Sequence, residues 1–213
     1  RKYEADYIDW EIIVNSDRVS LEEATITDTL PDGVKYVEES LAIYQQSTSV
    51  NGKVLSEIDV TDQLTYQIEN GEITVNFGDI YEQYVIRYRT DVTDEDKESF
   101  TNDVTFIAKD TPDKPAAATV NITRGKPLTK KTAAQGFNPK TGIIEWEIEF
   151  NYNQKQLNNE TLEDIWTVEP FREMYLVEDS LTFTEMNIDE TGSATPTGIV
   201  GLPSGAQIVK VEN

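Results

Sequence analysis

The sequence contains no cysteine and no histidine. Without thiols and imidazoles it cannot form disulfides, the common zinc sites, a cysteine nucleophile or a histidine base. An enzyme built from this chain would have to use carboxylates, lysine, tyrosine or serine. We therefore predict no metal site and no cofactor, whereas the cellular compartment stays open on composition alone.

Basic residues are scarce, because 18 Lys and Arg stand against 40 Asp and Glu, for a formal net charge of -22. Such a surface repels phosphate backbones and anionic lipids, so we predict no nucleic-acid partner. No apolar run approaches the roughly 20 residues of a membrane span, which predicts no membrane insertion. No signal peptide is visible after Arg1, and any targeting or anchoring segment is expected outside this sequence.

The sequence contains a long internal repeat. Trp10 to Asp28 match Trp146 to Asp164 at an offset of 136 residues, and after a four-residue insertion Ser40 falls on Ser180. The identities at the first offset are Ile8/Ile144, Trp10/Trp146, Glu11/Glu147, Ile12/Ile148, Asn15/Asn151, Leu21/Leu157, Thr25/Thr161 and Asp28/Asp164. The chain is therefore predicted to hold two copies of one module.

Within each copy the apolar residues alternate with polar ones, as in half-buried strands. Trp10, Ile12 and Val14 share one face, and similar runs recur at 84–88, 100–106, 118–122 and 144–150. Turn signals separate these runs at Pro31-Asp32-Gly33, Asn51-Gly52 and Asn70-Gly71. The predicted fold class is all-β, with tandem immunoglobulin-like antiparallel β-sandwich modules.

The boundary between the copies is predicted at a short connection through Gly125, Lys126 and Pro127. The first module then covers 1–124 and the second covers 125–213. Far fewer residues follow Trp146 than follow Trp10, so the second module is expected to be incomplete at its C-terminal end. Its acidic, Gly- and Thr-rich stretch at 187–198 is predicted to be a mobile loop.

Three polar residues fall on the apolar face of their predicted strands. Asp28 has the same parity as Ile26 and Leu30, Asp164 repeats this position in the second copy, and Asn102 alternates in step with Phe100 and Val104. A carboxylate among apolar neighbours is desolvated, favours its neutral form and needs a partner. These residues are candidates for chemistry, and the alternative is that they are hydrogen-bonded polar residues of a β core.

The second copy also contains two lysines that could react with such an aspartate and asparagine. Lys130 and Lys131 lie in its predicted first strand. A neutral lysine amine can attack the carbonyl of an asparagine while a protonated aspartate polarises that carbonyl and carries protons as ammonia leaves. The product would be an internal Lys to Asn amide, which joins two strands without cysteine. This would be a single-turnover reaction, and we predict no turnover enzyme.

Carboxylates also gather between Asp91 and Glu98. Their spacing lacks the glycine and the terminal glutamate of an EF-hand, so a solvated loop is favoured over a calcium site.

As a set, the motifs resemble the collagen-binding-type immunoglobulin-like modules of Gram-positive cell-wall adhesins. The segments responsible are IDWEIIVN, ATITDTLPDGVKYVEESLAIY, YVIRYRTDVTDEDKESFTNDVTF and, in the second copy, KKTAAQGFNPKTGIIEWEIEFN. The resemblance implies that Asp28 and Asp164 are the catalytic acids, that Asn102 is the acceptor amide, and that Lys131 is the nucleophile, with Lys130 as second choice. The lysine of the first module is then expected before Arg1, and the asparagine of the second beyond Asn213.

The resemblance also implies a location and a partner. It predicts an extracellular fragment of a surface adhesin at the cell wall, anchored to peptidoglycan through a segment outside this chain. The expected partner is an extracellular-matrix protein such as collagen, held between or across the sandwiches. The alternative is a passive stalk or pilin-like spacer with no ligand of its own.

Overall fold

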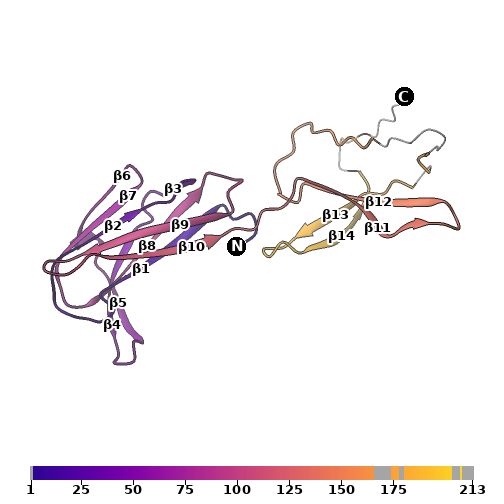
Figure 1. Cartoon of the computed structure of the whole chain (residues 1–213). Coiled ribbons are helices and arrows are strands. Elements are labelled where there is room, and N and C mark those ends of the chain that lie inside the picture. The colour runs from indigo at the N-terminus through magenta and orange to yellow at the C-terminus, as the bar shows by residue number, and fades with distance from the viewer. Residues whose placement is uncertain (1, 166–173, 178–179, 203–206, 208–213) are drawn as a thin grey trace. The chain divides into compact units, whose positions relative to one another are not determined.

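The computed structural model describes residues 2–165, 174–177, 180–202 and 207, and it also leaves the side chains of 131–135 and 200 undescribed. The chain divides into two compact units, one of Lys2–Arg124 and one that runs over Gly125–Asn213 (Figure 1). Each unit is described by itself below. No helix among the described residues is long and apolar enough to cross a membrane.

The first unit is a sandwich of two antiparallel sheets, which confirms the predicted all-β class (Figure 1). One sheet has the order β1-β8-β4-β5, with β3 also paired to β8, and the other has the order β10-β9-β2-β7-β6. The strands of the first sheet are β1 (Tyr7–Val14), β3 (Val34–Tyr36), β4 (Ala42–Thr48), β5 (Val54–Asp59) and β8 (Gln83–Val92). Those of the second are β2 (Leu21–Thr29), β6 (Thr65–Glu69), β7 (Glu72–Ile80), β9 (Ser99–Ile107) and β10 (Lys114–Asn121), and a 3-10 turn, η1 (Thr61–Gln63), precedes β6.

The apolar faces of the two sheets form one core. Trp10 and Ile8 of β1 and Ile26 of β2 are almost fully buried, and Phe100 of β9 has no exposed surface. Their alternation with exposed neighbours confirms the period of two that predicted these strands. The indole Nε1 of Trp10 donates to the Thr90 hydroxyl over 2.9 Å, which satisfies its one polar group inside the core.

Turns form where the sequence signals placed them. Asn70 and Gly71 both have positive φ, 52° and 78°, and join β6 to β7 in a two-residue hairpin. Gly33 has φ 86°, and an added Cβ there would lie 2.8 Å from the Asp94 Cβ. Glycine is therefore required at 33 both by backbone conformation and by the close approach of a neighbouring loop.

The second unit contains two antiparallel ribbons in its described part. β11 (Leu128–Asn138) pairs with β12 (Ile143–Phe150), and β13 (Thr184–Ile188) pairs with β14 (Ala194–Val200). The predicted mobile loop at 187–198 was wrong, because most of this stretch belongs to the β13–β14 hairpin. The Asp189 carboxylate fixes the turn by accepting hydrogen bonds from the backbone N–H of Thr191 and Ser193, at 2.8 and 3.0 Å.

Turns of the first unit have counterparts of the same geometry in the second. Asn15 and Asn151 have φ 56° and 57°, and each exchanges two side-chain hydrogen bonds with the backbone of the residue four positions later. At the second offset, the N–H groups of Ser40 and Ser180 each donate over 3.2 Å to the carbonyl three residues earlier. These local agreements support the duplication inferred from the sequence.

Candidate functional site

A cluster of three polar side chains lies in the core of the first unit. Asp28 is on β2 and Asn102 is on the neighbouring strand β9, whereas Tyr88 reaches them from β8 in the opposite sheet. The Tyr88 hydroxyl donates to Asp28 Oδ2 over 2.5 Å, and Asn102 Nδ2 donates to the same hydroxyl over 2.8 Å. Asp28 has no exposed surface and Asn102 retains 5%, which confirms that both residues face the core.

Burial controls the electrostatics of this cluster. It raises the pKa of Asp28 above its ordinary value, and the polar side chains of Tyr88, which donates to Asp28, and of nearby Asn102 oppose this effect only in part. Burial also raises the pKa of Tyr88, and the negative charge of ionised Asp28 adds to the shift. Burial therefore shifts the titration of both groups towards their protonated forms.

Two oxygens of the cluster have unused hydrogen-bonding capacity. In the part of the chain that the structure describes, Oδ1 of Asp28 and Oδ1 of Asn102 are buried and take part in no hydrogen bond. Buried polar atoms without a hydrogen-bond partner are costly and uncommon in folded proteins. They leave a carboxyl oxygen and an amide carbonyl available to a further polar group.

Tyr88 was not predicted from the sequence as a site residue. Its parity with Tyr84 and Ile86 marked it only as part of an apolar strand face. The signal that could have found it is the hydroxyl group, since a buried tyrosine on a core face requires a hydrogen-bond partner.

In the second unit the structure brings Lys130 and Asp164 together. Their side chains form an ion pair, and Lys130 Nζ also lies 4.8 Å from the centroid of the Trp146 ring. The side chain of Lys131, the preferred candidate from the sequence, lies outside the described residues. The backbone register sets Lys130 opposite Ile148 and Lys131 opposite Glu147.

The expectation that Asp164 is buried was wrong. Its side chain retains 33% exposure, whereas the equivalent Asp28 has none. The physical reason is that no other described strand pairs with the β11–β12 ribbon. Trp146 is accordingly 49% exposed, whereas Trp10 in the first unit is 5% exposed.

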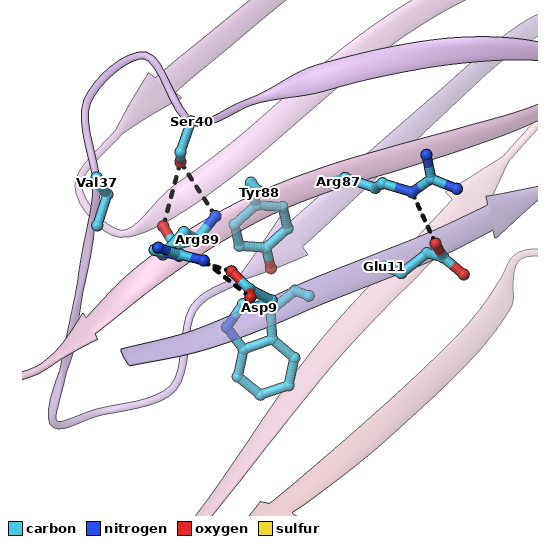
Figure 2. Close-up of a pocket in the computed structure, with 8 residues that line it drawn as sticks. Asp9, Glu11, Val37, Ser40, Arg87, Tyr88 and Arg89 are labelled. Atoms are coloured by element: carbon cyan, nitrogen blue, oxygen red, sulfur yellow. Dashed lines mark hydrogen bonds and ion pairs between the residues drawn. The ribbon is translucent and has the colours of Figure 1, made fainter. Parts of the chain in front are cut away.

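A second candidate site is an open hollow of about 510 Å3 on the outside of the β1-β8 pair (Figure 2). Arg89 Nε and Nη2 donate to the two carboxylate oxygens of Asp9 over 2.7 and 3.0 Å, and Arg87 Nε donates to Glu11 over 2.8 Å. The Ser40 hydroxyl donates to the Arg89 carbonyl and accepts from the Arg89 N–H, as Figure 2 shows. The remaining lining residues are Trp10, Val37 and Tyr88.

Aromatic rings and a further acid hold the two arginines of this hollow in place. The Arg89 guanidinium lies 3.8 Å from the centroid of Tyr7, and that of Arg87 lies 5.1 Å from Tyr44. Glu57 of β5 also pairs with Arg87, and these acid contacts raise the pKa of the Arg87 guanidinium. The sequence analysis missed this surface, although its two strands carry the complementary alternating motifs DWE and RYR.

The acidic loop between Asp91 and Glu98 is organised by its own backbone. The Asp94 carboxylate accepts hydrogen bonds from the N–H groups of Asp96 and Lys97, at 3.2 and 3.1 Å. Among the described residues, no three acidic side chains come together in a way that could hold a metal ion.

Comparison with known proteins identifies the family to which the sequence belongs. The sequence profile of the collagen binding domain matches residues 1–117, and no curated protein sequence matches the chain. A collagen-binding domain from a Staphylococcus aureus adhesin is 19% identical, with a TM-score of 0.43, over 55% of this chain and 88% of that one. The collagen binding subdomain of the Enterococcus faecalis surface protein ACE is 14% identical, with a TM-score of 0.44, over 57% and 90%.

A third solved structure, the collagen binding domain of the Erysipelothrix rhusiopathiae surface protein RspB, is 19% identical, with a TM-score of 0.41, over 55% of this chain and 45% of that one. The family profile covers more than half of the sequence, and it coincides with the sandwich that carries both candidate sites. The chain belongs to the collagen binding domain family.

Proposed function

We propose that the first unit binds a collagen triple helix on the outer face of its β1-β8-β4 sheet, as part of a surface adhesin of a Gram-positive bacterium. The observation that carries the proposal is the hollow lined by Asp9, Glu11, Arg87 and Arg89, in a unit that matches the collagen binding domain profile. The proposed location is extracellular, at the cell wall.

The chemistry of this face suits such a ligand. Chains of the triple helix are extended and polyproline-like, with backbone carbonyls that accept hydrogen bonds from outside. Arg87 and Arg89 present planar guanidinium donors, held by acids and by aromatic rings, so little side-chain entropy is lost when they bind. Because each arginine is paired with a carboxylate, the surface matches a ligand of mixed charge better than a purely acidic or purely basic one.

Binding of the chain to immobilised native collagen tests this proposal. We expect saturable binding, and we expect Arg89→Ala to weaken it by about tenfold or more, as truncation of an interfacial arginine does. Lys53→Ala is the matched control, because it removes the same charge from the exposed β4–β5 turn, away from the lining of the hollow. Both variants should keep the thermal midpoint of the parent chain, since exposed ion pairs contribute little to stability.

Two outcomes would reject the proposal. Absence of saturable binding to collagen would favour a passive spacer instead. Equal weakening by Arg89→Ala and Lys53→Ala would indicate a non-specific charge effect rather than contact at the hollow.

We propose further that the first unit is of the type that forms an internal Lys to Asn amide. Asp28 would act as the acid and Asn102 as the acceptor. The support is the burial of both side chains, the raised pKa of Asp28, and the two unpaired Oδ1 atoms found among the described residues. A lysine amine entering this apolar site would be driven towards its neutral, nucleophilic form.

In the second unit we propose Lys130, rather than Lys131, as the nucleophile beside Asp164. Residues directly opposite in an antiparallel pair share one face of the sheet. Lys130 therefore shares the face of Ile148 and Trp146, whose equivalents Ile12 and Trp10 face the core of the first unit. Its ion pair with Asp164 agrees with that assignment.

Intact mass tests the cross-link directly, because each amide formed releases one ammonia. We expect the full-length chain that contains this sequence to be lighter by that mass for each linkage, and peptide mapping to place one linkage at Asn102. Asn102→Ala should restore the unmodified mass of that peptide. A wild-type chain of unshifted mass would refute the cross-link.

A further inference from the structure

We propose that Tyr88 is a third catalytic group of the cross-linking site in the first unit, and that its hydroxyl protonates the nitrogen that leaves Asn102. This inference rests on the cross-link proposed above. It assigns a role to a residue for which neither the family resemblance nor the acid-amide pair gives one.

The hydroxyl of Tyr88 links the other two groups, because it hydrogen-bonds to both of them. It accepts from Asn102 Nδ2 at 2.8 Å and donates to Asp28 Oδ2 at 2.5 Å. Tyr88 is opposite Trp10 in the β1-β8 register, and its ring packs at 6.5 Å from that of Tyr36. With 3% of its surface exposed, the side chain is fixed in this orientation from the sheet opposite to Asp28 and Asn102.

The atom that Tyr88 contacts on Asn102 is the one that must depart. Amide formation joins the lysine nitrogen to Cγ of Asn102 and breaks the bond between Cγ and Nδ2, which leaves as ammonia. An amide nitrogen is a poor leaving group until it is protonated, so the reaction needs an acid at Nδ2. Among the described residues, the Tyr88 hydroxyl is the hydrogen-bonding group on Nδ2.

The proton balance closes through the same three residues. A neutral lysine amine attacks Cγ. Tyr88 gives its hydroxyl proton to Nδ2 and takes the proton of the protonated Asp28 carboxyl group in its place. The Asp28 carboxylate formed in this way then takes one proton from the lysine nitrogen. At the end Asp28 and Tyr88 hold the protons they began with, one amide has formed and one ammonia has left.

The arrangement also separates the two tasks of the site. Tyr88 contacts Oδ2 of Asp28, so Oδ1 of the carboxyl stays available to polarise the amide carbonyl and to take the amine proton. Asn102 donates through Nδ2, which leaves its Oδ1 available for that polarisation. One side of the cluster thus serves the leaving nitrogen, and the other serves the carbonyl and the attacking amine.

The test follows the loss of ammonia over time in the full-length chain, with peptide mapping at Asn102. Tyr88→Phe removes only the hydroxyl and keeps the ring, and we expect it to slow formation of the linkage by about 10²- to 10⁴-fold, the usual contribution of a general acid. Thr90→Val is the matched control. It also removes one buried hydroxyl from β8, but that hydroxyl accepts from Trp10 and has no contact with Asn102, so the linkage should form as in the wild type.

The outcomes separate the two proposals. Absence of the linkage in the wild type refutes the cross-link itself and the role of Tyr88 with it. A linkage that forms equally fast in the wild type and in Tyr88→Phe refutes only the role of Tyr88. Equal slowing in Tyr88→Phe and Thr90→Val also refutes that role, because it indicates a general effect of losing a core hydrogen bond.

A second measurement applies if Tyr88→Phe does not fold, as judged by its circular dichroism. Replacing Tyr88 by 3,5-difluorotyrosine keeps the ring and the hydroxyl but makes the hydroxyl more acidic. Since proton transfer responds to the acidity of the donor, we expect the rate and its pH dependence to shift. An unchanged rate and pH profile would overturn the assignment.

Discussion

Asp28 places a titratable carboxyl group in the apolar layer between two sheets. Burial raises its pKa, and the nearby polar side chains of Tyr88 and Asn102 do not cancel that effect. The folded state therefore holds the Asp28 proton up to a higher pH than the unfolded state, whose aspartates titrate near about 3.9. Between the pKa of Asp28 in the unfolded state and its higher pKa in the folded state, the folded chain binds more protons than the unfolded chain. The contribution of Asp28 to the free energy of unfolding therefore falls as pH rises through this interval.

Asp28→Asn removes this titration and keeps an oxygen that can accept from Tyr88. We expect the thermal midpoint of Asp28→Asn, relative to that of the wild type, to rise as pH increases from about 3, and to level off above the folded-state pKa of Asp28. Thermal melts of both proteins across this range, followed by circular dichroism, provide the measurement. A constant difference between the two curves would contradict a raised pKa at Asp28.

Parity along single strands was enough to predict two of the three clustered residues. Asp28 and Asn102 each fall in step with apolar neighbours on one strand, so a period of two reveals them. Tyr88 could not be assigned in this way, because its partners lie on the opposite sheet and sheet packing is not visible in a local pattern. The hollow was not predicted for a different reason, because its acids and arginines come from β1 and β8, and the pairing of two distant strands is not visible in a local pattern.

At the scale of elements, the strands were the most predictable feature and the second unit the least. Alternation located β1, β8 and β9 because each has one buried and one more exposed face, and the repeat located β12. Alternation also predicted part of β10, although that strand is almost wholly exposed. The prediction from composition was wrong at 187–198, because the acidic and small residues of this stretch are typical of loops. Its turn is instead built by Asp189, a local hydrogen-bonding device that composition does not distinguish from disorder.

Two glycines at turns give a matched pair for testing backbone conformation. Gly71 and Gly33 have similar φ, 78° and 86°, but a Cβ at Gly71 meets no atom within 4 Å, whereas one at Gly33 meets the Asp94 Cβ at 2.8 Å. We expect Gly71→Ala to lower the free energy of unfolding by about 1 kcal/mol, the cost of the left-handed conformation alone. Gly33→Ala should cost clearly more, because the loop carrying Asp94 must also move.

Urea unfolding of the two glycine variants measures this difference. The slope of the unfolding free energy against urea should stay that of the wild type, so that midpoints report stability. Equal losses at 33 and 71 would show that the loop around Asp94 yields without cost, and that its contact with Gly33 does not fix the β2–β3 connection.

At the scale of the whole molecule, charge is the dominant feature. The formal net charge is -22, so the acidic side chains repel one another over distances longer than single ion pairs. Salt has two opposing effects on such a chain. It screens the net repulsion, and it also weakens exposed pairs such as Arg87 with Glu11, whose side chains are 41% and 51% exposed.

We expect the screening of net repulsion to affect stability more than the weakening of exposed ion pairs. Exposed ion pairs contribute about 0 to 1 kcal/mol each, and with 40 acidic against 18 basic residues most carboxylates have no basic residue to pair with. Raising NaCl from about 10 mM to about 100 mM shortens the screening length from about 30 Å to about 10 Å, which removes most of the long-range repulsion. We therefore expect the thermal midpoint to rise over this interval at pH 7.

Thermal melts at constant pH and increasing NaCl concentration measure this rise. Chloride is the suitable anion because sulfate would also strengthen apolar burial. The rise should be smaller at about pH 4, where many carboxylates are protonated and the net charge falls. A midpoint that falls with salt at pH 7 would mean that local pairs such as those of Arg87 and Arg89, rather than net repulsion, dominate the electrostatic contribution to stability.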